Sequence, residues 1–229
     1  MTASMSFPVN TSLKPAIDEN AYQSYLASLL KGDRAECARI VQGLASSGAD
    51  LKSLYLRLFQ RALYAVGELW ERQQISVAVE HLATAITERM LTLVQPLVFS
   101  GGGPKSRSIV VVCTAGEFHQ IGGRMIADLC ELSGWRGYFL GADTSLDELL
   151  RTIALRRPSL LGLSLALLTN LPSLLKALDA VRTDHPRLPI VVGGQAFRFG
   201  GQEALQAYPE VSYVASFSDL EKRLASFEP

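Results

Sequence analysis

The chain has 229 residues, of which 48% are hydrophobic and 19% are charged, the balance of a soluble globular protein. Its 22 Lys and Arg residues equal its 22 Asp and Glu residues, which argues against direct binding to nucleic acid, because a basic face supplies most of that affinity. The sequence has no basic, apolar leader and no uninterrupted apolar run of about 18 residues, so we expect neither a secretory signal nor a membrane span.

The first half of the chain predicts a flexible arm followed by a helical bundle. Residues 1–17 are polar and contain prolines, which favours a loose arm. Residues 18–99 contain few Gly or Pro residues, and their apolar side chains recur at helical spacing. We predict four helices packed as a bundle cap, with Asp33, Asp50 and Ser76 as N-caps. The predicted helices span residues 19–31, 33–46, 50–73 and 76–98.

The second half predicts a linker and a parallel sheet. Residues 100–107 include three consecutive glycines and a proline, which predicts a linker. From residue 108 to 229, apolar runs typical of buried parallel strands alternate with helical patterns, which predicts a Rossmann-like domain with five strands in the flavodoxin-like order 2-1-3-4-5. The predicted strands span residues 108–113, 136–141, 160–167, 189–193 and 211–216. The predicted helices lie near residues 121–133, 145–156, 171–184, 201–207 and 218–227.

The loop after the first strand contains the candidate ligand of a metal. It includes Glu117, His119 and Gly122, at the edge where such sheets bind ligands. An imidazole there can coordinate a metal through one nitrogen if an acceptor fixes the other ring N–H. The alternative is that His119 begins a helix and binds nothing.

Two further features lie at the ends of later strands. Ser164 lies in the third strand, and Gly193 and Gly194 follow the fourth. Small side chains at these positions would leave a slot between strands. Alternatively, Ser164 is a core hydroxyl and the glycine pair is an ordinary turn.

Together these residues resemble the cobalamin-binding domain of methionine synthases and their relatives. The resemblance is carried by Glu117-x-His119-x-x-Gly122, Ser164 and Gly193-Gly194. It implies that His119 displaces the dimethylbenzimidazole of the cofactor and becomes the lower axial cobalt ligand. The freed nucleotide tail would then enter the slot lined by Ser164 and the glycine pair. The enzymes usually carry Asp where this chain has Glu117, and the Glu form is associated with B12 photoreceptors.

The helical half contains a second pattern, Trp70 followed after nine residues by Glu80 and His81. It resembles the cap of CarH-type light-dependent regulators. There the Trp covers the upper face of the corrin beside the 5′-deoxyadenosyl group, and the Glu and His line that pocket. Val77 lies three to four residues before this pair and shares its helical face. The alternative is a core Trp and a surface Glu-His pair.

The resemblance implies a B12-dependent light sensor that binds adenosylcobalamin between the helical cap and the Rossmann-like domain. The regulators carry a helix-turn-helix DNA-binding domain that we do not expect here, which suggests output through a protein partner or a homo-oligomer, as in AerR-like or photocobilin-like proteins. A second chromophore, biliverdin or another bilin, would be bound non-covalently. Glu71 follows Trp70 where light-sensing members carry a His that captures cobalt after illumination, so we expect a different photoproduct.

Other functions remain open. The main alternative is a corrinoid methyl-carrier protein of a methyltransferase system, and a haem sensor is a third. We find no catalytic constellation and do not expect an enzyme. Cys37, Cys113 and Cys130 form no CxxC pair, so we expect no cysteine metal site but buried thiols in the cytoplasm.

Overall fold

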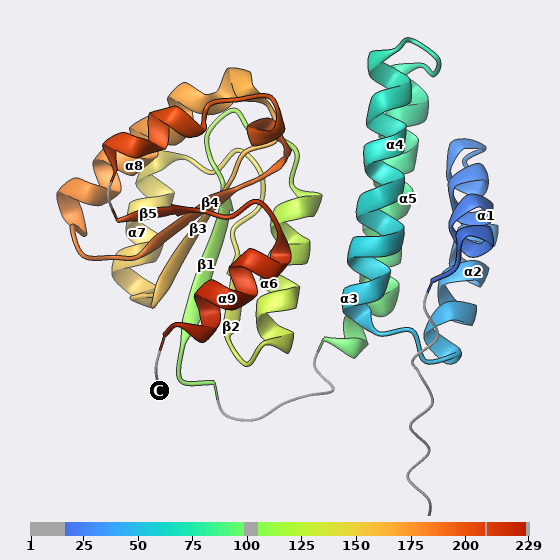
Figure 1. The fold of residues 1–229 in the computed structure, drawn as a ribbon, viewed down its shortest axis with the longest axis horizontal. Coiled ribbons are helices and arrows are strands. Elements are labelled where there is room, and N and C mark those ends of the chain that lie inside the picture. The colour runs from blue at the N-terminus through green and yellow to red at the C-terminus, as the bar shows by residue number, and fades with distance from the viewer. Residues whose placement is uncertain (1–16, 99–104, 209, 228–229) are drawn as a thin grey trace, which may run out of the picture. The chain divides into compact units, whose positions relative to one another are not determined.

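The computed structural model describes residues 17–98, 105–208 and 210–227. The chain divides into two compact units, Met1–Val94 and Gln95–Pro229 (Figure 1). The predicted arm, apart from residue 17, and most of the predicted linker lie outside the described residues. No helix in the described part of the chain is long and apolar enough to cross a membrane.

The first unit is the predicted helical bundle. Asp18, Asp33 and Asp50 each accept a hydrogen bond from a backbone N–H three residues later, which fixes where helices begin. The Ser76 hydroxyl accepts a longer bond, 3.4 Å, from the Val79 N–H. The helices are α1 (Glu19–Leu30), α2 (Arg34–Ser46), α3 (Leu51–Ser53), the π-helical η1 (Leu54–Phe59), α4 (Gln60–Glu71) and α5 (Val77–Val94).

The third predicted helix contains a π-helical segment that its sequence did not indicate. Four of the six residues of η1 are completely buried: Leu54, Tyr55, Leu58 and Phe59. The Phe59 ring lies 5.8 Å from that of Tyr25 and 6.0 Å from that of Tyr55, measured between centroids. The wider turn therefore directs two aromatic side chains into the core of the bundle together.

The second unit is a five-stranded parallel sheet, as predicted. The hydrogen-bonded order is β2-β1-β3-β4-β5. The strands are β1 (Ser108–Cys113), β2 (Arg136–Phe139), β3 (Leu160–Ser164), β4 (Ile190–Gly193) and β5 (Val211–Tyr213). The central strands are almost wholly buried because helices cover both faces of the sheet (Figure 1).

The helices of the sheet unit cover both faces of the sheet, two on each. Figure 1 shows α6 and α9 on one face and α7 and α8 on the other. Leu149 of α7 and Leu178 of α8 pack against Val112 and Leu163 in the core on the second face. These helices are α6 (Ile121–Leu132), α7 (Leu146–Arg156), α8 (Leu171–Asp184) and α9 (Phe217–Ala225).

One predicted helix takes a different form. The segment near residues 201–207 is a 3₁₀ helix, η6 (Gln202–Ala207), preceded by another, η5 (Gln195–Arg198). Gly200 and Gly201 both have positive φ, 122° and 84°, which prevents a continuous α-helix from forming through them. The sheet therefore has only short helical turns between β4 and β5.

Candidate functional site

The topology of the sheet brings the predicted site residues of the second unit together. In the register of the strands, Cys113 at the end of β1 lies opposite Ser164 at the end of β3, and Ser164 lies opposite Gly193 at the end of β4. The His119 loop leaves β1 directly after this row. Three sequence segments that are far apart in the chain thus meet at the carboxyl edge of the sheet, where such folds bind ligands.

Glu117 holds the imidazole of His119. One carboxylate oxygen, Oε1, lies 2.7 Å from His119 Nδ1 and accepts the backbone N–H of His119 at 3.0 Å. The Glu117 side chain has no exposed surface, whereas that of His119 is 49% exposed. A fully buried carboxylate therefore holds a ring that is exposed at the surface.

The other oxygen of Glu117 joins a second loop to the first. Oε2 accepts the backbone N–H groups of Ala166 and Leu167, at 2.9 and 3.1 Å, and the side-chain amide of Asn170 at 3.1 Å. The Asn170 amide also donates to the Gly116 carbonyl. The sequence did not indicate these partners, because backbone donors have no side-chain signature and Asn170 reads as an ordinary helix-start residue.

The hydrogen bonds decide the charge of Glu117. Burial raises the pKa of its carboxyl, but the bonds donated by His119, Ala166 and Asn170 outweigh burial and lower that pKa to about 2. The carboxylate is consequently ionised near neutral pH. An ionised acceptor at Nδ1 favours the tautomer with hydrogen on Nδ1, so a metal would bind through Nε2.

The start of α6 presents backbone rather than side chains beside His119. Gly122 is exposed, and a Cβ atom added to it would meet no atom within 4 Å. Gly123 is buried, and a Cβ there would lie 2.8 Å from the Phe139 ring. Gly123 is thus needed for helix–sheet packing, whereas Gly122 leaves open surface in the first turn of α6, three residues after His119. A flat macrocycle coordinated by His119 fits this combination of donor and open backbone.

The packing of the fold accounts for the two glycines at the end of β4. Gly194 has φ 123°, and a Cβ on it would lie 2.1 Å from the Leu165 carbonyl oxygen. A Cβ on Gly193 would lie 3.0 Å from the Val214 carbonyl oxygen. Ser164 is half-buried beside Cys113, whose thiol pKa is raised to about 12 by burial and by the charge of Glu117. The nucleotide-tail slot therefore stays a prediction, although its residues are neighbours.

The predicted residues of the helical unit lie near the turn that joins α4 to α5. Trp70, in the last turn of α4, is 45% exposed, and Val77, the first residue of α5, is 50% exposed. The Glu80 carboxylate accepts from the Thr84 hydroxyl at 2.9 Å and lies 3.5 Å from His81 Nε2. The alternative of a core Trp is wrong, since Trp70 is 45% exposed, but its second part, a surface pair of Glu80 and His81, agrees with the 74% exposure of His81.

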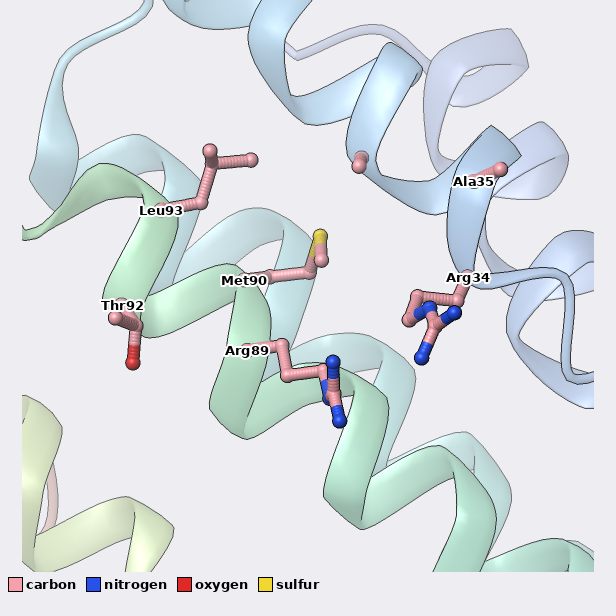
Figure 2. Close-up of a pocket in the computed structure, with 7 residues that line it drawn as sticks. Arg34, Ala35, Arg89, Met90, Thr92 and Leu93 are labelled. Carbon is pink, nitrogen blue, oxygen red and sulfur yellow. The ribbon is translucent and has the colours of Figure 1, made fainter.

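A shallow groove lies elsewhere on the helical unit, between α2 and α5. Figure 2 shows the side chains of Arg34 and Arg89 reaching into the gap from opposite helices. The α5 residues of the groove begin eight positions after His81, which corresponds to roughly 12 Å along a helix. The groove is therefore separate from the predicted residues around Trp70. Its lining comprises Arg34, Ala35, Ala38, Arg89, Met90, Thr92 and Leu93.

Two models of known protein families match the chain. One B12 binding domain family matches residues 107–220, and a second B12 binding domain family matches residues 21–95. These matches fall on the sheet unit and the helical unit, respectively. The chain therefore belongs to the B12-binding proteins, and the predicted resemblance is confirmed.

Several curated proteins are similar in sequence. The HTH-type transcriptional repressor CarA of Myxococcus xanthus is 32% identical over 136 residues, 58% of this chain and 44% of CarA. The repressor CarH of the same organism is 27% identical over 177 residues, 77% of this chain and 58% of CarH. The methanol–corrinoid protein of Methanosarcina barkeri is 28% identical over 114 residues, 48% of this chain and 44% of that protein. The chain spans about half the length of these relatives.

A solved structure confirms the fold class. The monomethylamine corrinoid protein of Methanosarcina barkeri superimposes with a TM-score of 0.78, covering 92% of this chain and 99% of that chain. The two share 13% sequence identity, so this likeness shows the fold alone.

Proposed function

We propose that the chain is a cobalamin-binding sensory module in which Nε2 of His119 is the lower axial ligand of cobalt. The observation that carries this proposal is the buried, ionised Glu117 carboxylate on Nδ1 of a half-exposed imidazole. When bound, cobalamin would supply a cobalt centre that carries an exchangeable upper ligand, which is light-sensitive when it is an alkyl group.

The residues of the chain would perform three tasks at the lower face. Glu117 fixes the orientation and tautomer of the imidazole and raises its basicity as a ligand. Gly122 leaves room beside the ring for the corrin to approach. Ser164, Gly193 and Gly194 would line the path of the displaced nucleotide tail, as the family resemblance implies.

The decisive experiment is substitution of the ligand. We expect His119→Ala to lower cobalamin affinity by at least the roughly 10–100-fold typical of losing an outer-shell partner, and to remove the spectrum of base-off, His-ligated cobalamin. His185→Ala is the matched control, because it removes the other histidine of the sheet unit. Unchanged affinity and spectrum in His119→Ala would overturn the assignment.

We further propose that the upper ligand is adenosyl, with Trp70, Val77, Glu80 and His81 around it. The exposure of Trp70 and Val77 supports this proposal, because it leaves their apolar side chains accessible to a ligand. Equal affinity for adenosylcobalamin and methylcobalamin, unchanged by Trp70→Ala, would instead favour the methyl carrier. The similarity to the methanol–corrinoid protein makes that carrier the second candidate.

Light response and output are tested on the intact holoprotein. Absorbance spectra and size-exclusion profiles, recorded in darkness and after illumination, should differ for a sensor that changes its oligomeric state or partner. A bilin chromophore is tested by adding biliverdin and looking for a red-shifted band. We do not propose an enzymatic activity for the chain itself.

A further inference from the structure

The loop that carries His119 is also held from the side of β2. Asp143, in the loop after β2, accepts the backbone N–H of Gly116 on Oδ1 at 2.8 Å. Its own N–H donates to the carbonyl oxygen of Glu117 at 2.9 Å. These two bonds form a reciprocal pair between segments that are 27 residues apart in sequence.

The backbone of Asp143 is left-handed, a conformation that Asp tolerates better than most residues. Its φ is 48°, and Gln73 and Arg157 are the other non-glycine residues with positive φ in the described part of the chain. Left-handed backbone is unfavourable for side chains other than Gly, Asn and Asp, and it persists where surrounding contacts demand it. From this conformation Asp143 makes the pair of bonds to Gly116 and Glu117.

The cobalt-ligand loop is thus held on two sides. Towards β3, the second carboxylate oxygen of Glu117 binds the loop that contains Asn170. Towards β2, Asp143 fixes the backbone of the two residues that precede Phe118 and His119. Residues 117–120 belong to no helix or strand, so these side-chain contacts determine where the imidazole lies.

We propose that Asp143 is a positioning residue for the cobalt ligand: its reciprocal hydrogen bonds set the Glu117 backbone so that the buried carboxylate meets Nδ1 of His119. The effect on cobalamin rests on the function proposed above. The positioning of the loop itself is a property of the protein without cofactor, and it can be measured separately.

Three substitutions separate the carboxylate from the backbone conformation. Asp143→Gly keeps the left-handed conformation at no strain and removes the acceptor of the Gly116 N–H. Asp143→Asn also tolerates this conformation and keeps an oxygen acceptor. Arg157→Gly is the control, because it places glycine at another left-handed position of the sheet unit, at the end of α7.

The test compares these variants with the unsubstituted protein. It measures hydrogen exchange of residues 114–121 in the cofactor-free protein, and then the affinity and the spectrum of bound cobalamin. Asp143→Gly should accelerate amide exchange in the loop, weaken cobalamin binding about 10-fold and lower the His-ligated fraction in the spectrum. Asp143→Asn should restore most of each property, and Arg157→Gly should change none of them.

The outcomes distinguish this inference from the proposed function. Unchanged loop exchange in Asp143→Gly overturns the positioning role, and so does a lower melting temperature with an unaltered His-ligated spectrum, which indicates a merely structural turn. Accelerated exchange, together with an unsubstituted protein that never shows His ligation, upholds positioning of the loop and overturns the cobalt-ligand proposal instead.

Discussion

The His119 loop and the α4–α5 turn contain the two sets of predicted site residues, and they differ in how firmly the protein holds them. Around His119, a fully buried carboxylate accepts five hydrogen bonds from two segments. Near the α4–α5 turn, Trp70 and Val77 are about half exposed and His81 is 74% exposed. The His119 imidazole, our proposed lower ligand, is therefore held in place by the fold, whereas Trp70, Val77 and His81 are held by few contacts within the helical unit.

The largest effect is expected where the fold itself forbids a side chain. Gly194→Ala should prevent stable folding of the sheet unit, because the new Cβ would meet the Leu165 carbonyl at 2.1 Å in a backbone of positive φ. Thermal unfolding by circular dichroism measures this. Gly122→Ala is the matched control: it should unfold normally and still bind cobalamin less tightly. A stable Gly194→Ala protein would show that the backbone around Gly194 and Leu165 can shift to admit a Cβ atom.

Loss of the buried carboxylate should affect both stability and binding. Glu117→Gln places an amide donor against backbone donors, so we expect about 1–3 kcal/mol of destabilisation in the cofactor-free protein. Cobalamin affinity should fall roughly 10–100-fold. Denaturant unfolding and spectroscopic titration measure the two effects. Glu80→Gln makes the same change on the helical unit and should alter the free energy of unfolding by no more than about 0.5 kcal/mol. Equal destabilisation by the two substitutions would show that the two regions do not differ in how firmly they hold these carboxylates.

Trp70 should affect ligand choice more than stability. Because Trp70 is 45% exposed, Trp70→Ala should lower the free energy of unfolding by about 1–2 kcal/mol, less than the roughly 3–5 kcal/mol of a fully buried Trp. Its preference for adenosylcobalamin over methylcobalamin should fall several-fold, as measured by competitive titration, and Trp70→Phe should retain part of it. Marked destabilisation by Trp70→Ala would mean that this side chain supports the bundle.

The smallest change is expected from Glu71. Binding in darkness should be the same in Glu71→His as in the unsubstituted protein, since Glu71 is an exposed residue in the last turn of α4. After illumination, the substitution should convert a photoproduct sensitive to added cyanide or imidazole into a stable bis-histidine spectrum. A bis-histidine spectrum in the unsubstituted protein that survives His81→Ala would contradict our interpretation of Glu71.

Much of the fold was predictable from local patterns. The buried run Ser108–Cys113 and its alternation with helical segments indicated a parallel sheet, and its order was as expected. The His119 motif was visible because its residues lie within six positions of one another. The π-helical turn of Leu54–Phe59 was not predictable, because it depends on how Tyr55 and Phe59 pack against neighbouring helices.

The sequence by itself determined the class of the protein, its two kinds of unit and the candidate cobalt ligand, because these follow from periodicity and from residues close together in the chain. Only the tertiary structure decided what holds that ligand. Glu117 or its neighbour Gly116 is reached by Asn170, by the Ala166 and Leu167 amides, and by Asp143, from 26 to 54 residues away. Such contacts exist because the strand order places the loops after β2 and β3 on either side of the loop after β1, and no local pattern in the sequence records that arrangement.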